Sequence, residues 1–133
     1  MDPKKTHGAL SWMEWRGAEA QDTRDFYAEL FGWSKIDLPM QDGSTYPAYG
    51  VGAVSDGGIA AAPDGGFAAE LGSSSQWLPY ITVDDVDERV KQAVDSGGRV
   101  EAPPFDAPGV GRIAVIRDPA GAAIALIRYP EAA

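Results

Sequence analysis

The feature that most constrains the fold is an order of elements that occurs twice along the chain. In each half, hydrophobic patterning predicts a strand, a helix and then three short strands. When the sequence is shifted by 65 residues against itself, identical residues coincide within these elements. They are Trp12 and Trp77, Asp22 and Asp87, Arg24 and Arg89, Ala28 and Ala93, Gly32 and Gly97, Pro39 and Pro104, Ile59 and Ile124, and Ala60 and Ala125. We therefore expect an α+β protein of two βαβββ modules.

Pairing two such modules can cover sheet surface that a single module leaves exposed. A four-stranded sheet covered by one helix leaves its other face bare, and pairing two of these sheets can enclose a cleft. The predicted segments are a flexible tail (1–7), two modules (8–63 and 76–130) and a Gly/Ser-rich linker (64–75). The strand predicted at 57–63 would close the first module, and Pro47 favours an edge position for the strand at 45–52.

The two helices have recognisable ends. The segment 20–33 has apolar residues at helical spacing and stops at Gly32. The segment 85–98 begins with Asp85 and Glu88 at the spacing of a capping box. Both signals predict one amphipathic helix for each module.

Composition excludes several classes of function. The formal net charge of −9 disfavours a general nucleic-acid surface and an anionic membrane, although it favours a cationic ligand. The chain has no cysteine, which excludes disulfides and thiolate metal sites. Without a predicted secretion signal or membrane span, we expect a cytoplasmic protein.

Three phrases together resemble a known superfamily. They are "SWMEW…DFYAELFGW", "WLPYITVDDVDERVKQAVDSGG" and "GGRVEAPPFDAPGVGRIAVIRDPAGAAIALI". In this order they resemble the vicinal oxygen chelate superfamily, which includes glyoxalase I, bleomycin-resistance proteins and extradiol dioxygenases. The resemblance implies an open barrel of two βαβββ modules around a ligand cleft. It also implies a homodimer, and in many members one divalent metal.

The resemblance also shows where metal ligands would lie. The corresponding positions hold Trp12, Ala60, Ala125 and either Leu78 or Trp77, depending on how the second module is aligned. None of these side chains binds a divalent metal. The only histidine, His7, lies in the predicted tail. The sequence therefore predicts no metal and no other cofactor.

Aromatic and polar side chains remain as candidates for the cleft. Strand alternation places Trp12, Glu14 and Arg16 on one face. Glu14 could pair with a cationic ligand, act as a general base, or simply pair with Arg16. Arg112 could hold a ligand anion or pair with one of the many acids. The predicted ligand-binding residues are Trp12, Glu14, Tyr46, Tyr49, Trp77, Leu78, Tyr80, Phe105 and Arg112.

Four functions are compatible with these residues. The leading hypothesis is metal-independent binding and sequestration of a small aromatic or cationic molecule, such as antibiotic self-resistance of the bleomycin-resistance type. The alternative is a small-molecule enzyme, such as a lyase, isomerase, cyclase or dioxygenase, with Glu14 as general base. A metal-dependent lyase or dioxygenase comes third. A non-catalytic interaction protein whose cleft is filled by side chains comes fourth.

Overall fold

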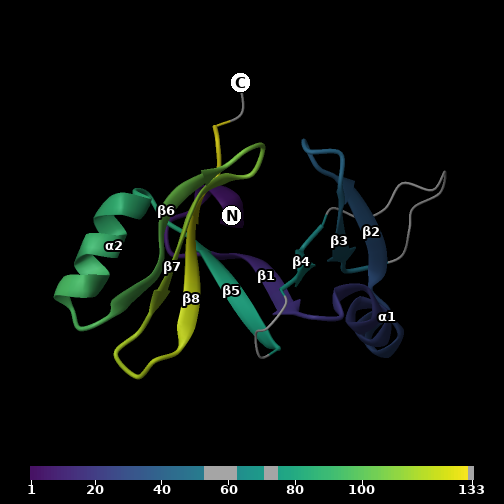
Figure 1. Ribbon diagram of the computed structural model, residues 1–133. Coiled ribbons are helices and arrows are strands. Elements are labelled where there is room, and N and C mark those ends of the chain that lie inside the picture. Colours follow the sequence, from purple (N-terminus) through teal and green to yellow (C-terminus); the bar gives the residue numbers. More distant parts are fainter. Residues whose placement is uncertain (53–62, 71–74, 132–133) are drawn as a thin grey trace. The chain divides into compact units, whose positions relative to one another are not determined.

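The computed structural model describes residues 1–52, 63–70 and 75–131 (Figure 1). Its contacts divide the chain into an N-terminal unit (Trp12–Trp77) and a C-terminal unit (Met1–Ser11 with Leu78–Ala133). The first repeat comprises β1 (Leu10–Gly17), α1 (Ala20–Phe31), β2 (Ser34–Pro39), β3 (Thr45–Gly50) and β4 (Gly65–Ala69). The second comprises β5 (Gln76–Thr82), α2 (Val86–Asp95), β6 (Arg99–Ala107), β7 (Gly111–Arg117) and β8 (Ala123–Arg128). The predicted α+β fold of two βαβββ modules is confirmed.

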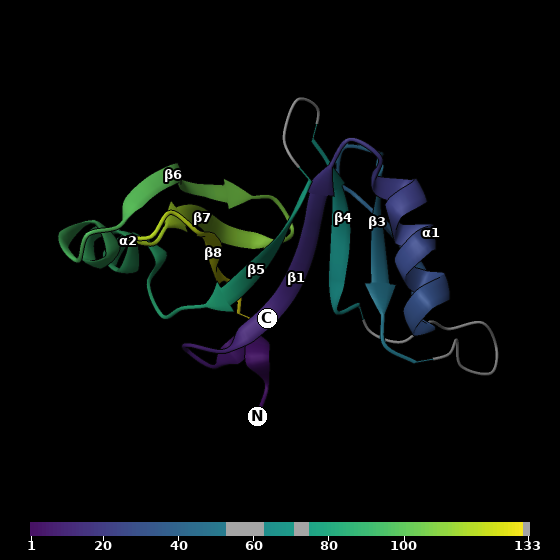
Figure 2. The same ribbon diagram turned by 90° about the horizontal axis from the view of Figure 1, so that it is seen from below.

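In the N-terminal unit the strands lie in the order β2-β3-β4-β1. β1 runs parallel to β4, whereas β2 and β3 are antiparallel to their neighbours. α1 contacts β2, β3 and β4, and Figure 2 shows it running alongside β3 and β4. The helix and sheet enclose a buried cluster of Trp15, Ala20, Tyr49 and Phe67. The opposite face of this sheet is called the open face below.

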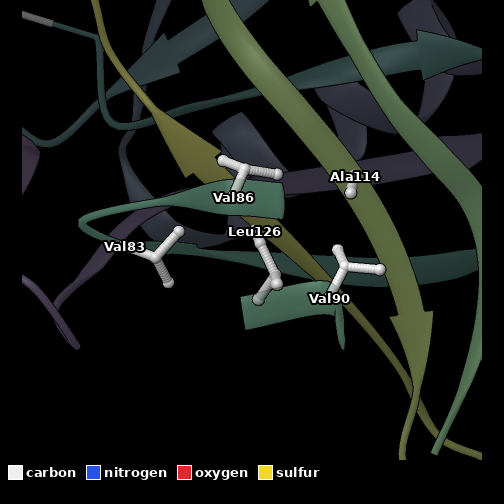
Figure 3. Close-up of a cluster of buried hydrophobic side chains, with 5 residues drawn as sticks. All are labelled: Val83, Val86, Val90, Ala114 and Leu126. Carbon is white, nitrogen blue, oxygen red and sulfur yellow. The ribbon is translucent and has the colours of Figure 1, made fainter. Parts of the chain in front are cut away.

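The C-terminal unit repeats this plan with strands in the order β5-β8-β7-β6. β5 is parallel to β8, and the other pairs are antiparallel. Val86 and Val90 of α2 pack against Ala114, Leu126 and Val83, as Figure 3 shows. Val86 and Val90 thus form the buried face of this amphipathic helix, whereas Val94 is exposed.

The N-terminal cap of α2 and the C-terminal glycine of α1 agree with the sequence signals, although α2 ends at Asp95. The Asp85 side chain accepts a hydrogen bond from the Glu88 backbone N–H at 3.1 Å, so it caps the N-terminus of α2. Gly32 follows α1 with a φ of 70°, a left-handed conformation that glycine adopts without steric cost. Its N–H donates to the Ala28 carbonyl at 2.8 Å.

Two expectations about the first module differ from the structure. β3 lies between β2 and β4 and is not an edge strand; its pairing with β4 covers Ala48 and Tyr49 and stops before Pro47. Pro47 has no N–H to donate, and it lies beyond the residues of β3 that pair with β4, so no hydrogen bond between these two strands is lost. The segment expected to be a linker contains β4, and most of the strand expected at 57–63 lies outside the described residues.

The segment expected to be a flexible tail is bonded to the C-terminal unit. Pro3–Lys5 forms a short 3₁₀ helix, and the Pro3 carbonyl accepts a 2.7 Å hydrogen bond from the Thr82 hydroxyl. His7 Nδ1 accepts a hydrogen bond from the Asp84 N–H at 3.0 Å. These long-range bonds could not be read from the polar composition of the segment. No helix in the described part of the chain is long and apolar enough to cross a membrane.

Candidate functional site

The candidate site lies on the open face of the N-terminal unit, along β1. Alternation along this strand turns Trp15 toward α1, where it joins the buried cluster. Its neighbours Glu14 and Arg16 consequently face the other way, as does Trp12. Glu14 is buried, with 8% of its surface exposed. A buried carboxylate requires hydrogen-bond donors or an opposite charge close by.

Both oxygens of the Glu14 carboxylate receive a donor. The Arg16 Nε–H donates to Oε1 at 2.7 Å, which also forms an ion pair. The Tyr46 hydroxyl donates to Oε2 at 2.7 Å, although Tyr46 comes from β3. Two short bonds to an ionised group fix the carboxylate in position. Pairing of Glu14 with Arg16, one of the alternatives for this residue, is present, and Tyr46 joins it.

An aromatic surface accompanies this carboxylate. The ring centroids of Trp12 and Tyr46 lie 6.3 Å apart, and their planes are inclined by 31°. Trp12, Glu14, Arg16 and Tyr46 are called the Glu14 cluster below. The structure therefore brings together three of the predicted ligand-binding residues within one unit.

The glycine at position 66 explains how Tyr46 reaches Glu14, whereas its neighbour Gly65 packs against other atoms. Gly66 is in register with Glu14 on one side and with Ala48 on the other. A Cβ atom added to Gly66 would collide with the phenol end of Tyr46, which lies directly over this glycine. A Cβ atom on Gly65 would collide with the Met13 carbonyl oxygen and the Tyr49 ring. These glycines are thus sites of close packing in a strand, which is why a linker was the wrong expectation for them.

Tyr49 and Trp77 lie elsewhere, in the aromatic cluster beneath α1. Tyr49 stacks on Trp33 with centroids 3.9 Å apart, and the Trp77 ring meets Tyr27 edge-on at 5.2 Å. The Trp77 indole N–H also donates to the Tyr27 hydroxyl at 3.4 Å. Burial, reinforced by the charge of Asp64, raises the pKa of Tyr49 to about 12. Tyr49 is therefore a neutral phenol at neutral pH.

The other predicted residues lie in the C-terminal unit. Register pairs Tyr80 with Ala125 and Phe105 with Ile113, which places Leu78, Tyr80 and Phe105 on the face away from α2. Leu78 is 1% exposed, whereas Phe105 is 45% exposed. Arg112 lies on the face that carries α2, where it pairs with Asp87 and Asp106. Arg112 also lines an open surface hollow of about 330 Å³ beside Arg128 and Tyr129.

The described residues offer no cluster of three or more His, Asp or Glu side chains that could hold a metal ion. Of the positions that correspond to family metal ligands, Ala125 pairs with Tyr80 inside the C-terminal unit. Ala60 lies outside the described residues. His7 is bonded to Asp84, as described above. The donor set around the Glu14 cluster, one carboxylate with an arginine against it, does not suit a divalent cation.

The sequence alone did not point to Gly66. It indicated Arg16 only as a possible ion-pair partner of Glu14. The signal for Gly66 was present, since two glycines precede the apolar residues Phe67, Ala68 and Ala69. Such a pair is compatible with a strand in which another backbone or ring approaches closely. Only the structure shows that the ring is that of Tyr46.

Known proteins resemble the chain in sequence. The protein named "Putative glyoxylase CFP32" of Mycobacterium tuberculosis is 34% identical over 127 residues, which cover 93% of this chain and 48% of that protein. "Anthracycline biosynthesis protein DnrV" of Streptomyces peucetius is 32% identical over 129 residues, covering 91% and 47%. The chain thus spans about half the length of the curated relatives it matches.

Solved structures with the same fold are more distant in sequence. Methylmalonyl-CoA epimerase from Mycobacterium tuberculosis superposes with a TM-score of 0.61 at 16% identity, covering 96% of this chain and 92% of that one. The hypothetical protein BH1468 from Bacillus halodurans gives a TM-score of 0.64 at 12% identity, covering 96% and 99%. These similarities concern the fold alone.

The family model named Glyoxalase/Bleomycin resistance protein/Dioxygenase superfamily matches residues 9–126. This match covers both βαβββ repeats except the last two residues of β8, and it includes the Glu14 cluster. The chain therefore belongs to the glyoxalase/bleomycin resistance protein/dioxygenase superfamily.

Proposed function

We propose that the protein binds a small aromatic molecule, without a metal, at the Glu14 cluster on the open face of the N-terminal unit. The observation that supports this most directly is a carboxylate fixed by Tyr46 and Arg16 beside the Trp12–Tyr46 rings. Aromatic rings hold flat ligands by stacking and burial, and a fixed polar group orients them. Sequestration of a ligand, as in bleomycin resistance, requires only this affinity.

The geometry favours an aromatic ligand over a cationic one. Arg16 lies 2.7 Å from Glu14 and neutralises its charge locally. A cation arriving at Glu14 would therefore meet the positive guanidinium as well as the carboxylate. The relative named as an anthracycline biosynthesis protein also supports an aromatic natural product as the ligand.

Leu78, Tyr80 and Phe105 stay predicted ligand contacts of the C-terminal unit.

A thermal-shift and fluorescence titration tests the proposal with two flat probes: alizarin, kept uncharged by a mildly acidic buffer, and cationic proflavine. We expect alizarin to raise the melting temperature in metal-free buffer, since a ligand at about 100 times its Kd adds about 2.7 kcal/mol to the stability. Trp12→Ala should weaken this effect. Phe26→Ala, which removes an exposed aromatic side chain from α1 on the opposite side of the sheet, should leave it unchanged.

Two results would contradict the proposal. If neither probe nor a wider set of aromatic compounds binds, the open face is not a ligand site. If alizarin binds equally well to wild type and to Trp12→Ala, the ligand occupies another place. Stronger binding of proflavine than alizarin would favour the cationic ligand class instead.

An enzymatic role is the second candidate, and the Tyr46–Glu14 hydrogen bond is the observation that favours it. A carboxylate in contact with a phenol can take a proton from a substrate and return it. For any compound that the protein transforms, Glu14→Gln should abolish turnover and largely preserve binding. Unchanged turnover in this variant would exclude Glu14 as the base.

The family resemblance further suggests a homodimer. Light scattering at working concentration should give twice the mass of the chain. A monomer mass would contradict this expectation.

A further inference from the structure

The Tyr46–Glu14 bond spans the whole width of one strand. Ala48 on β3, Gly66 on β4 and Glu14 on β1 are consecutive partners in register, so they form one row across the sheet. Tyr46 precedes Ala48 by two residues and shares its face. From there its side chain crosses β4 above Gly66, and its hydroxyl meets Glu14 Oε2 at 2.7 Å.

The nearest atoms to an added Cβ at Gly66 are Cε2, Oη and Cζ, all from the phenol end of Tyr46. This end is the far end of a flexible side chain rather than backbone, so an alanine at position 66 can be accommodated if the ring swings away. That movement would break the bond to Glu14. Gly65 differs because its added Cβ would meet the Met13 backbone carbonyl, which no side-chain rotation relieves.

We infer that Gly66 is a positioning residue, which acts through Tyr46 to hold Glu14 in its ligand-binding orientation. The functional part of this inference rests on the proposed function. With glycine at position 66, the Tyr46 hydroxyl donates a hydrogen bond to Glu14 Oε2, and the Tyr46 ring lies against Trp12. With a larger residue, Oε2 loses this donor and the aromatic surface changes shape. The residue at position 66 therefore determines what the open face presents to a ligand.

The first test measures the Tyr46–Glu14 contact in the full chain without any ligand. In protein with isotope-labelled tyrosine, the Cζ resonance of Tyr46, assigned by its loss in Tyr46→Phe, reports the hydrogen bond of the hydroxyl. We expect this resonance to shift in Gly66→Ala and in Glu14→Gln in the same direction. An unchanged Cζ resonance in Gly66→Ala would overturn the inference, whether or not a ligand is ever found.

A double-mutant cycle separates positioning from a general loss of stability. Gly66→Ala should lower the melting temperature of wild type but not that of Tyr46→Ala, because the collision is then gone. Gly65→Ala is the matched control and should lower the melting temperature in both backgrounds. If Gly66→Ala alone does not fold, folding of Gly66→Ala/Tyr46→Ala supports the inference. If the double variant also fails, Gly66 serves the strand itself and the inference is wrong.

The ligand readout uses alizarin. Gly66→Ala and Tyr46→Phe should each weaken its affinity, by roughly tenfold if one hydrogen-bonded group is displaced. The double variant Gly66→Ala/Tyr46→Phe should be no weaker than Gly66→Ala alone. Additive losses would show that Gly66 acts independently of the Tyr46 hydroxyl and would overturn the inference. Failure of alizarin and proflavine to bind wild type would instead contradict the proposed function and leave the result of the Cζ test standing.

Discussion

Arg112 of β7 holds Asp87 of α2 in a two-pronged ion pair. Its Nε and Nη2 atoms lie 2.8 Å and 3.0 Å from the two carboxylate oxygens. A third bond runs from Nη1 to Asp106 Oδ1 at 3.0 Å, so one guanidinium links the helix to β6 and β7. This arrangement commits Arg112 to the α2 side of its sheet, which is the pairing alternative that the sequence left open.

Removing the Asp87 charge should make the protein less stable at neutral pH but not in acid. Hydrogen bonds from Arg112 hold the pKa of Asp87 below its ordinary value of 3.8. Because the folded-state pKa is lowered, the stabilisation is present above pH 3.8 and is lost as the pH falls through the folded-state pKa. Melting temperatures of wild type and Asp87→Asn should therefore differ near pH 7 and converge well below pH 3.8.

Asp106→Asn is the matched control for this prediction. Asp106 makes one bond to the same guanidinium and its side chain is 80% exposed, against 50% for Asp87. Its loss should lower the melting temperature less, because solvent screens it more. Equal effects of the two substitutions at neutral pH would show that the two-pronged geometry adds nothing.

Tyr49 should make the protein lose stability in alkaline solution. Its pKa is raised to about 12 from an ordinary value of 10.0, so the folded state keeps a proton that the unfolded chain releases. The stabilisation is complete below pH 10 and is lost as the pH rises toward 12. Urea denaturation across this range should show a steeper decline for wild type than for Tyr49→Phe. Parallel declines would mean that Tyr49 does not carry the effect.

Local patterns in the sequence predicted the elements of the fold, and non-local packing decided the rest. The apolar spacing in α1 and α2 and the alternation that unites Trp12 with Glu14 depend only on near neighbours in the chain. The role of Gly66 depends on Tyr46, which β3 brings over it from another strand. Composition alone made the Gly65–Gly66 pair typical of a linker, because the atoms of Met13, Tyr46 and Tyr49 that lie against these glycines come from other strands.

Strand register explains the placement of the other predicted residues. Phe105 and Ile113 are partners and share one face of the C-terminal unit, whereas Arg112, the neighbour of Ile113, faces α2. A shift of one residue in register would exchange these faces. The sequence of β7 does not determine which of its faces meets α2, because the strand carries apolar residues on both faces. Arg112 consequently lies on a different face from Leu78 and Tyr80.

The Asp85 cap should contribute measurably to the stability of α2. Its side chain satisfies the Glu88 N–H, which has no partner within the helix. Asp85→Ala should lower the free energy of unfolding by about 1 kcal/mol. Asp85→Ser retains an acceptor at the cap and should restore most of this loss. If the serine variant is as unstable as the alanine variant in chemical denaturation, the cap bond is not the source of the effect.

Phe67 should be the most costly aromatic side chain to remove from the N-terminal unit. It is fully buried, and its ring centroid lies 5.7–6.2 Å from the ring centroids of Trp15, Tyr27, Tyr49 and Trp77. Phe67→Ala leaves a cavity among rigid rings, so we expect a loss of about 3–5 kcal/mol in the free energy of unfolding. Phe26→Ala, at a side chain that is 61% exposed, should change it by less than about 0.5 kcal/mol.

Denaturant titration followed by tryptophan fluorescence measures both variants, because Trp15 and Trp77 lie against Phe67. A loss below about 1 kcal/mol for Phe67→Ala would mean that the cluster collapses into the space left by the ring.

The open face provides a second readout in the same variant. Phe67 and the Glu14 cluster lie on opposite faces of one sheet, so alizarin should still bind the folded fraction of Phe67→Ala with nearly wild-type affinity. A large loss of affinity would show that the aromatic cluster beneath α1 also shapes the ligand site.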